Sequence, residues 1–573
     1  MSDTRQSLPA VPPPVASSEV RPVGSGRSRP PSSSGRFLAR AAFLTAALTA
    51  ASALLGLVRD QIIAHLYGAG PDTDAFLVAW TVPEVSSTLL IEDAMALVLV
   101  PAFSLALARR AAAESPELPD PVRALMRTTL PALFLALSAG AALLAATAPW
   151  VVTVLAPGLP ARQLAVSCTR LTATCAFSFG LAGYISAALR AHGSFVAPAA
   201  IYGAYNIGII ATMLSFGERW GVRAAAAGVA VGGVLMVLAQ LPALARRLKE
   251  RGPAAAREPA VARETGDPAR GAAGDGETGR AKGATRPPPV ALALLAPVIV
   301  FALSRQSQVL IERFLAAPLP AGAISHLNYA QKVAQMPMVL SLMLCTVTFP
   351  VVARAMAAGE TEVARRRVER DLALAAIIVL LGAATVVACA PQIVHVLFQR
   401  GAFTPADTAA TASVMRVYAL GLLGQTLVGA LVRCYFSAAR PLWFPALAML
   451  AGLAVNTAGG ALLVRGWGVQ GIAAANALGI TLTAALLLGA VGRHSVPVRV
   501  GRTTAGLARL AVAAAGATCA GRLCGALIPS PLLAVAAACP AVAAVFLVLA
   551  HALGAPETDT VLRPLTRKPA HAR

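Results

Sequence analysis

Long apolar runs separated by short polar stretches, Gly or Pro dominate the chain. A helix that crosses a bilayer needs about 20 mainly apolar residues, and fourteen runs reach that length. The pattern predicts an all-α polytopic membrane protein with about 14 transmembrane helices. The runs lie near 37–58, 74–101, 125–156, 164–189, 195–216, 222–245, 290–314, 323–350, 372–398, 409–436, 442–464, 469–491, 504–528 and 531–553.

Two segments lack the apolar periodicity of the predicted spans. Residues 1–35 are mostly Pro, Ser, Gly and Arg, a composition typical of a disordered tail. Residues 246–289 are rich in Gly, Ala, Arg and Glu and predict a flexible linker that divides six spans from eight. Large transporters are often built from repeated halves around a midplane site. The expected organisation is a tail (1–35), an N-lobe of six helices (36–245), a linker (246–289), a C-lobe of six helices (290–492), two further helices (493–553) and a second tail (554–573).

Composition excludes an ordinary soluble protein. Of the 573 residues, 57% are hydrophobic and 13% are charged, whereas soluble domains are about 45–50% apolar and about 25% charged. The net charge of +22 raises the possibility of nucleic-acid binding. Sorted by segment, however, about 35 of the 48 Lys and Arg residues fall on the side of the two termini. Lys and Arg are retained in the cytoplasm, so we expect both termini, with tail and linker, to be cytoplasmic, and no nucleic acid as a partner.

Several motifs of enzymes and metal proteins are absent. The eight cysteines stand singly in apolar runs, without the spacing of metal ligands. The chain contains no ATP-binding P-loop and no nucleophile motif of a hydrolase. We therefore expect no catalytic residues, no metal, no cofactor and no enzymatic activity.

Ionisable residues at membrane depth are the candidates for chemistry, because a charge that faces lipid is costly and needs a cavity or a partner. Asp74 and Glu92 are eighteen residues apart, which is five turns of an α-helix, so they would share one face. The predicted cavity-lining residues are Arg59, Asp74, Glu92, Asp93, Arg305 and Lys332.

Neighbouring opposite charges allow a second interpretation. Arg59–Asp60 and Glu312–Arg313 lie near helix ends, where they could be satisfied ion pairs between helices that hold helix register, or could take part in gating. Pro83, Pro101, Pro337 and Pro350 interrupt the second and eighth runs, either as ordinary kinks or as hinges for a rocking lobe. The sequence leaves both alternatives open.

Three sequence blocks resemble the MurJ/MviN family of lipid II flippases, within the MATE-like multidrug/oligosaccharidyl-lipid/polysaccharide exporter superfamily. The resemblance covers about 36–495 in order. LGLVRD (55–60), YGAG (67–70) and TDAF (73–76) resemble the opening of that family. SHLNYAQK (325–332) resembles its eighth helix, and LFQRGAFT (397–404) resembles the turn after its ninth.

The resemblance implies a flippase that moves a polyprenyl-pyrophosphate-linked peptidoglycan precursor, lipid II, across the bacterial cytoplasmic membrane by alternating access. Arg59, Lys332, Asp74 and Glu92 match polar positions of the family. The two cations would hold the pyrophosphate and face the acidic residues between the lobes, and the last two helices would form a groove for the lipid tail. Without a P-loop, a membrane potential or an ion gradient would drive transport. Membrane lipid and cell-wall synthesis proteins are the other implied partners.

The chain also departs from the family. Ala53 stands where the family usually has arginine, Ser87-Thr88 stand near a basic pair of the family, and Lys332 replaces an arginine. Arg305 would partly compensate. Because arginine binds phosphate with two nitrogens and lysine as a point charge, a related exporter of another lipid-linked glycan or a specialised product is an alternative. A further alternative is a non-transporting scaffold for wall-synthesis proteins, recruited through the tail and the linker.

Overall fold

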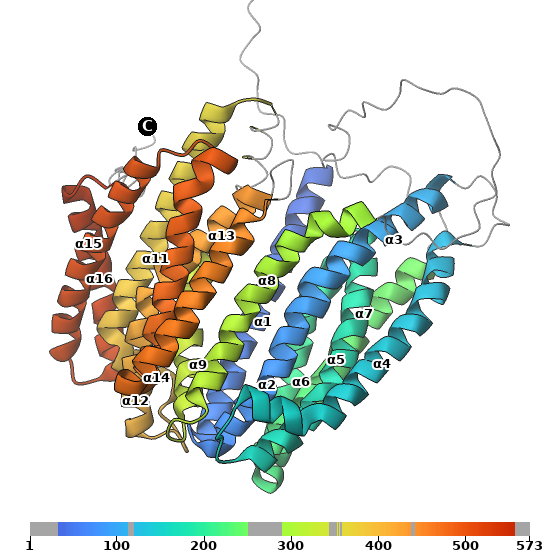
Figure 1. Cartoon of the computed structure of the whole chain (residues 1–573), viewed down its shortest axis with the longest axis horizontal. Helices are drawn as coiled ribbons and strands as arrows, with labels where there is room; N and C mark the ends of the chain where they lie inside the picture. The colour runs from blue at the N-terminus through green and yellow to red at the C-terminus, as the bar shows by residue number, and fades with distance from the viewer. Residues whose placement is uncertain are drawn as a thin grey trace, which may run out of the picture.

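The computed structural model of the chain describes residues 33–112, 120–249, 289–342, 352, 355, 358–436 and 442–555 (Figure 1). Within these ranges every regular element is a helix, as the apolar pattern predicts. The predicted tails and linker lie almost wholly outside the described residues. The helices are α1 (Ser33–Tyr67), α2 (Pro71–Ser86), the π-helix η1 (Ser87–Asp93), α3 (Ala94–Ala112), α4 (Pro121–Leu155), α5 (Arg162–Ala191), α6 (Val196–Trp220), α7 (Arg223–Lys249), α8 (Pro289–Ala316), α9 (Ala323–Ala334), α11 (Thr361–Phe398), α12 (Pro405–Leu420), α13 (Leu422–Phe436), α14 (Phe444–His494), α15 (Val500–Ala526) and α16 (Pro531–Ala552).

Ten of the described helices are long and apolar enough to cross a membrane, or eleven if α12 and α13, which meet at 44°, form one span. The membrane class is therefore confirmed, whereas the count of fourteen stays a prediction. One reason for the difference is α14, which runs through two predicted spans. Its only break is at Gly468, whose φ of 53° and ψ of −129° are not helical.

The helices form two groups that stand side by side (Figure 1). Helices α1 to α7, with η1, pack on one another and are called here the first half. In the second half, α8 packs against α14 and α9 against α12, while α11, α12 and α13 join them. The C-terminal pair, α15 and α16, packs on α11 at the edge of the molecule.

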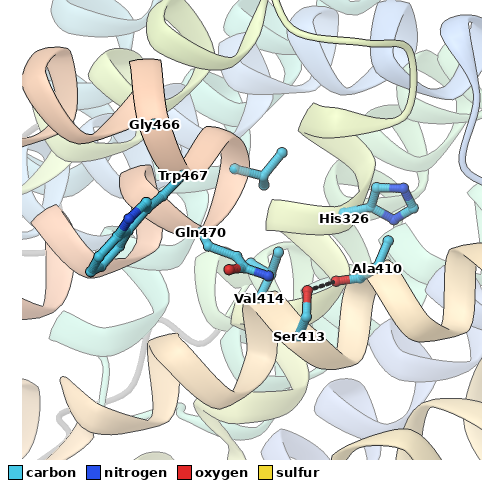
Figure 2. A pocket seen from close by; sticks show the side chains of 8 residues that line it. His326, Ala410, Ser413, Val414, Gly466, Trp467 and Gln470 are labelled. Carbon is cyan, nitrogen blue, oxygen red and sulfur yellow. Dashed lines mark hydrogen bonds between the residues drawn. The ribbon is translucent and has the colours of Figure 1, made fainter.

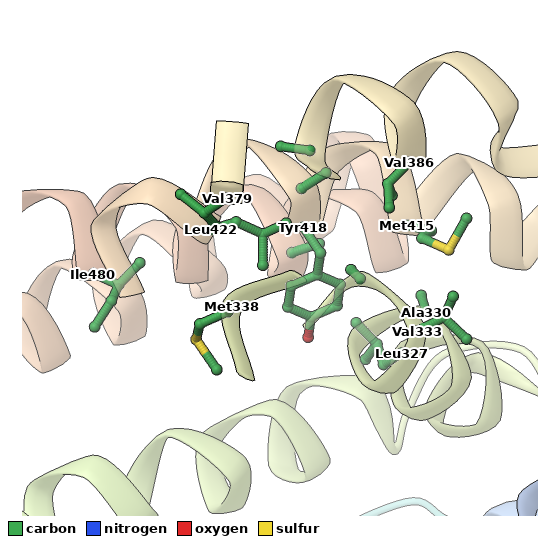
Figure 3. Packing of buried hydrophobic residues seen from close by; sticks show 14 of the residues in the cluster. Leu327, Ala330, Val333, Met338, Val379, Val386, Met415, Tyr418, Leu422 and Ile480 are labelled. Atoms are coloured by element: carbon green, nitrogen blue, oxygen red, sulfur yellow. The ribbon is translucent and has the colours of Figure 1, made fainter. Parts of the chain in front are cut away.

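The core of the second half is made of aliphatic and aromatic side chains from α9, α11 and α12. Leu327 and Val333 of α9 meet Val386 of α11 and Met415 and Tyr418 of α12 (Figure 3). All five are buried. In a bilayer such packing replaces contacts with lipid chains, so its close fit, more than its hydrophobicity, determines the arrangement.

Pro83 and the π-helix that follows it interrupt the second predicted run. Proline has no N–H, so the carbonyl of the residue four positions earlier, Ala79, loses its helical donor. The hydroxyl of Thr172 on α5 donates to that carbonyl at 3.1 Å. The wider turn of η1 then breaks the regular spacing of 3.6 residues. The expectation that Asp74 and Glu92 share one face assumed an uninterrupted α-helix and does not hold here.

We expect Thr172→Val to destabilise the first half, because the buried carbonyl of Ala79 then has no donor. The expected cost is about 1–3 kcal/mol, measured as a lower apparent melting temperature in detergent. Thr169→Val is a matched control, since the buried Thr169 hydroxyl donates only to the Ala165 carbonyl of its own helix. Equal melting temperatures for the two variants would contradict this role of Thr172.

Candidate transport site between the two halves

Three charged side chains from the two halves meet in one cluster. Arg59 donates from Nη2 to Asp60 Oδ1 at 2.7 Å and from Nε to the same oxygen at 3.0 Å. Lys332 of α9 lies with Nζ 3.4 Å from the other oxygen, Asp60 Oδ2. Asp60 therefore bridges a cation of the first half and a cation of the second. The predicted Arg59–Asp60 pair is present, and Lys332, which has no acidic neighbour in sequence, has its partner in the other half.

Neutral side chains of the first half orient this cluster. The indole of Trp80 on α2 lies 4.5 Å from the guanidinium carbon of Arg59 and 5.6 Å from Lys332 Nζ, measured from the ring centroid. Such cation–π contacts are strongest where water is excluded. Asn206 of α6 accepts from Arg59 Nη1 at 2.9 Å and donates to the Ser52 carbonyl at 3.1 Å. The guanidinium is thus held from three sides.

A cavity of about 530 Å³ reaches this cluster within the first half. It is lined by α1, η1 and the facing ends of α5 and α6, and Asn206 is one of its walls. Arg190 is the one basic residue among its lining residues, and Ala53 lies in its wall at a position where the sequence resemblance leads one to expect arginine. The cavity wall is thus mainly apolar, with a few hydroxyls from Thr45, Thr49 and Ser52, and carries little charge of its own.

Asp74 closes one end of the interface between the halves. Its Oδ2 accepts from the Gly322 amide at 2.7 Å, and its Oδ1 accepts from the Ser325 amide at 2.7 Å and the Ser325 hydroxyl at 2.6 Å. Gly322 is the N-cap residue of α9 and has no capping side chain. A carboxylate from the first half therefore caps a helix of the second, where the helix dipole favours negative charge.

Close backbone contacts surround this cap, at what we call the closed end (connections 68–70, 317–322 and 399–404; bottom of Figure 1). The Ala402 amide donates to the His65 carbonyl at 2.9 Å. Gly322, with φ 94°, approaches so closely that a Cβ there would lie 2.6 Å from the Ala69 carbonyl oxygen. A glycine is needed at this position for its left-handed backbone and for the close approach.

The predicted role of Asp74 thus differs from the observed one. The prediction has Arg59 and Lys332 facing Asp74 and Glu92, whereas within the described residues both cations contact Asp60. Asp74 is 3% exposed and uses its oxygens on α9. Glu92 and Asp93 end η1, but their side chains lie outside the described residues.

Within the described residues, Glu312 and Arg313 are held by neutral partners on other helices and not by the ion pairs between helices that were one of the alternatives. Both are buried on α8. Glu312 accepts from Asn476 Nδ2 at 2.7 Å, and Arg313 donates to Asn328 Oδ1 at 3.2 Å and to the Ile324 carbonyl at 3.3 Å. No ion pair joins the two residues to each other in the part of the chain that the structure describes. Each one instead ties α8 to a different helix of the second half.

Two more acidic or basic residues lie along the interface. Arg305 is on α8 with an exposed side chain. Glu84 of α2 lies close enough to Lys332 and Glu312 for their charges to interact. Its Oε2 is buried and accepts no hydrogen bond from any described residue. One turn along, Gln306 of α8 donates to the Thr88 hydroxyl at 3.0 Å, another contact between the halves.

A second cavity, of about 540 Å³, lies in the second half at the closed end. His326 of α9, Ser413 of α12 and Gln470 of α14 face it (Figure 2). His326 Nδ1 is 2.9 Å from the Thr411 hydroxyl. This cavity is separate from the charged cluster, and among the described residues no group of His, Cys, Asp and Glu has the arrangement of a metal site.

Comparison with known families identifies the chain. The model of the family described as "Lipid II flippase MurJ" matches residues 63–529. The chain belongs to the MurJ family. The match begins beside the charged cluster and extends into the C-terminal pair, so the family covers both halves and most of the chain.

Curated MurJ relatives match over most of their length. The "Probable lipid II flippase MurJ" of Bdellovibrio bacteriovorus is 25% identical over 80% of this chain and 83% of its own. The "Lipid II flippase MurJ" of Burkholderia cenocepacia is 26% identical over 70% of this chain and 73% of its own. The resemblance predicted from the sequence blocks is confirmed.

Solved structures agree on the fold. "Lipid II flippase MurJ, inward closed conformation" superposes with a TM-score of 0.69 at 16% identity and covers 92% of this chain and 100% of its own. An inward-facing multidrug resistance MATE family transporter of the MOP superfamily gives a TM-score of 0.58 at 15% identity, over 81% and 99%. The MurJ fold is thus shared with a wider class of membrane transporters.

Proposed function

We propose that this protein is a flippase for lipid II, the polyprenyl-pyrophosphate-linked peptidoglycan precursor, and carries it across the bacterial cytoplasmic membrane for cell-wall synthesis. Membership in the MurJ family and the relatives named as lipid II flippases support the substrate. The observation that carries the mechanism is a cationic site, Arg59 with Lys332, whose two members come from different halves.

The charged cluster is suited to bind a pyrophosphate reversibly. In its absence Asp60 neutralises part of the positive charge of Arg59 and Lys332. A pyrophosphate would compete with Asp60 for both Lys332 and Arg59. In a site with little water, such charge-assisted bonds are short and strong. Because Lys332 moves with the second half, binding of the anion is coupled to the relative position of the halves.

Alternating access follows from the closed end. With Asp74 bonded to α9 the site is sealed on the side of the 68–70 and 399–404 connections. We propose that this is the outer side, which agrees with cytoplasmic termini and the excess of Lys and Arg on the side of the termini. Release of Asp74 from α9 would open the site to the outer leaflet. A membrane potential or an ion gradient would supply the energy.

Complementation of a strain depleted of its own lipid II flippase tests the substrate. We expect the full chain to restore growth and the labelling of lipid II in the outer leaflet. Restored growth without outer-leaflet lipid II, or membrane insertion without rescue, would contradict the proposal. Rescue by a variant with Glu84, Glu92 and Asp93 all neutralised would favour the scaffold alternative over transport.

One observation favours a second candidate. The wall of the 530 Å³ cavity contains Ala53, where the family resemblance implies arginine, and has Arg190 as its one basic residue. A cargo with fewer negative charges near the sugar would fit such a wall. Normal insertion without rescue, together with outer-leaflet delivery of another polyprenyl-linked glycan, would establish this alternative.

A further inference from the structure

Two arginines lie outside the site between the halves and are used by no step of the proposed transport. Arg416 is on α12 and Arg522 is on α15 of the C-terminal pair. Arg416 is eleven residues from the start of α12, and Arg522 is four residues before the end of α15, or about 6 Å along that helix. A charge on a membrane helix is costly without a partner and points to a function.

The Nε atom of Arg416 stabilises the backbone of α11. Pro391 of α11 has no N–H, so the carbonyl of Val387, four residues earlier, has no helical donor. Arg416 donates to it from Nε at 3.3 Å. Val386 and Met415, the neighbours of these two residues, pack in the core of the second half (Figure 3). The contact therefore holds the guanidinium at the edge of that core and leaves its Nη nitrogens unused.

The C-terminal pair brings the second arginine to the same turn of α11. A Cβ on Gly521 would lie 2.9 Å from the Ala388 Cβ, so α15 approaches α11 closely just before Arg522. Because Arg416 donates to Val387 and Arg522 follows Gly521, which packs on Ala388, both arginines lie at the same turn of α11. Within the described residues neither one has a carboxylate at ion-pair distance, and the exposed Arg522 makes no hydrogen bond. Two neighbouring arginines without an acid favour a bound anion.

The surroundings identify the kind of anion. Both arginines belong to helices that cross or enter the membrane. Leu523, next to Arg522, is 70% exposed on the outside of α15, where lipid chains would cover it. An anion that reaches this seam is therefore carried on a lipid. The planar guanidinium group of arginine matches the spacing of two phosphate oxygens and binds them with two of its nitrogens.

We propose that Arg416 and Arg522 form a binding site for the phosphate of a membrane lipid, at the seam of α11, α12 and α15. The lipid is either a glycerophospholipid or a polyprenyl pyrophosphate, which present the same phosphate chemistry. The site lies apart from Arg59 and Lys332 and does not depend on what the protein transports. It would hold the C-terminal pair and a lipid headgroup in one place.

Native mass spectrometry of the purified full-length protein tests the site with three probes: phosphatidylglycerol, farnesyl pyrophosphate and inorganic pyrophosphate. We expect saturable binding of a lipid probe by the unaltered protein. Arg522→Gln should weaken it at least about tenfold, since a hydrogen bond to a charged group is lost. Each measurement is repeated in a Lys332→Ala background, because the proposed transport site would also bind the pyrophosphate probes. In that background Arg416→Gln with Arg522→Gln should abolish binding, while the glutamine amide introduced on α12 can still donate to the Val387 carbonyl.

Arg502→Gln is the matched control, because Arg502 is exposed at the opposite end of α15 and makes no ion pair with a described residue. It should bind as the unaltered protein does. Preference for phosphatidylglycerol assigns a glycerophospholipid, and preference for farnesyl pyrophosphate assigns a polyprenyl lipid. Equal affinity in Arg522→Gln and the unaltered protein, or inorganic pyrophosphate binding as tightly as either lipid, would overturn the proposal. Arg522 is exposed, so its variant should fold normally, which a thermal melt checks.

Discussion

Arg59→Ala and Lys332→Ala are each expected to lower flipping by about 100-fold, because each removes charge-assisted bonds to the pyrophosphate worth about 1.5–3 kcal/mol apiece. Arg59→Ala should be the more severe, since it also leaves the buried Asp60 with only Lys332 as a partner. The measurement is outer-leaflet lipid II in a flippase-depleted strain, at matched expression of each variant.

The matched control is Lys332→Arg. It keeps the charge beside Asp60 and adds a second nitrogen for phosphate. We expect it to transport at least as well as the unaltered protein. Full complementation by Lys332→Ala at normal expression would show that the interface cation is not needed and would remove the basis of the mechanism.

Asp74→Ala is expected to separate the two halves at the closed end and to stop transport. The substitution removes three hydrogen bonds to a carboxylate and the cap of α9. At about 1.5–3 kcal/mol for a hydrogen bond to a charged group, losing even one would raise the population open at that end by about tenfold or more. Spin labels at Glu218 and Arg400, one in each half, should then report longer distances.

Asp72→Asn controls for the loss of negative charge on α2. Asp72 is exposed two residues before Asp74 and bonds to no residue of the second half within the described chain. Its variant should keep the short label distance and normal transport. A short distance in Asp74→Ala would mean that the backbone contacts of Gly322 and Ala402 hold the closed end without the carboxylate.

Sequence reasoning found most members of the charged cluster but not their partners. Arg59, Asp60 and Lys332 stood out because charge in an apolar run is conspicuous. The bridge from Asp60 to Lys332 joins residues far apart in the chain, and no local pattern encodes it. Asn206 and Trp80 were missed altogether, although a lone Asn in an apolar helix is a signal that could have pointed to the first.

Local patterns were an incomplete guide in two places. Ion pairs between helices were one alternative for Glu312 and Arg313, but within the described residues their hydrogen bonds go to the neutral amides of Asn476 and Asn328. The spacing of Asp74 and Glu92 was counted in α-helical turns, and the π-helix after Pro83 interrupts that count. In the second case the error came from extending a regular α-helix past Pro83, where the structure has a π-helix.

The class of this protein can be predicted without a structure, from apolar runs of membrane length, from an excess of Lys and Arg on the side expected for the termini, and from three motif blocks of the MurJ family. These features depend on residues close together in the chain, on transfer from water to lipid, and on charge retention, none of which needs tertiary contacts. The structure was needed to show that Asp74 caps a helix of the other half, that Asp60 joins two cations, and that Arg416 replaces a donor lost to Pro391. These contacts join segments that are far apart in the chain, so they depend on how whole helices pack against one another.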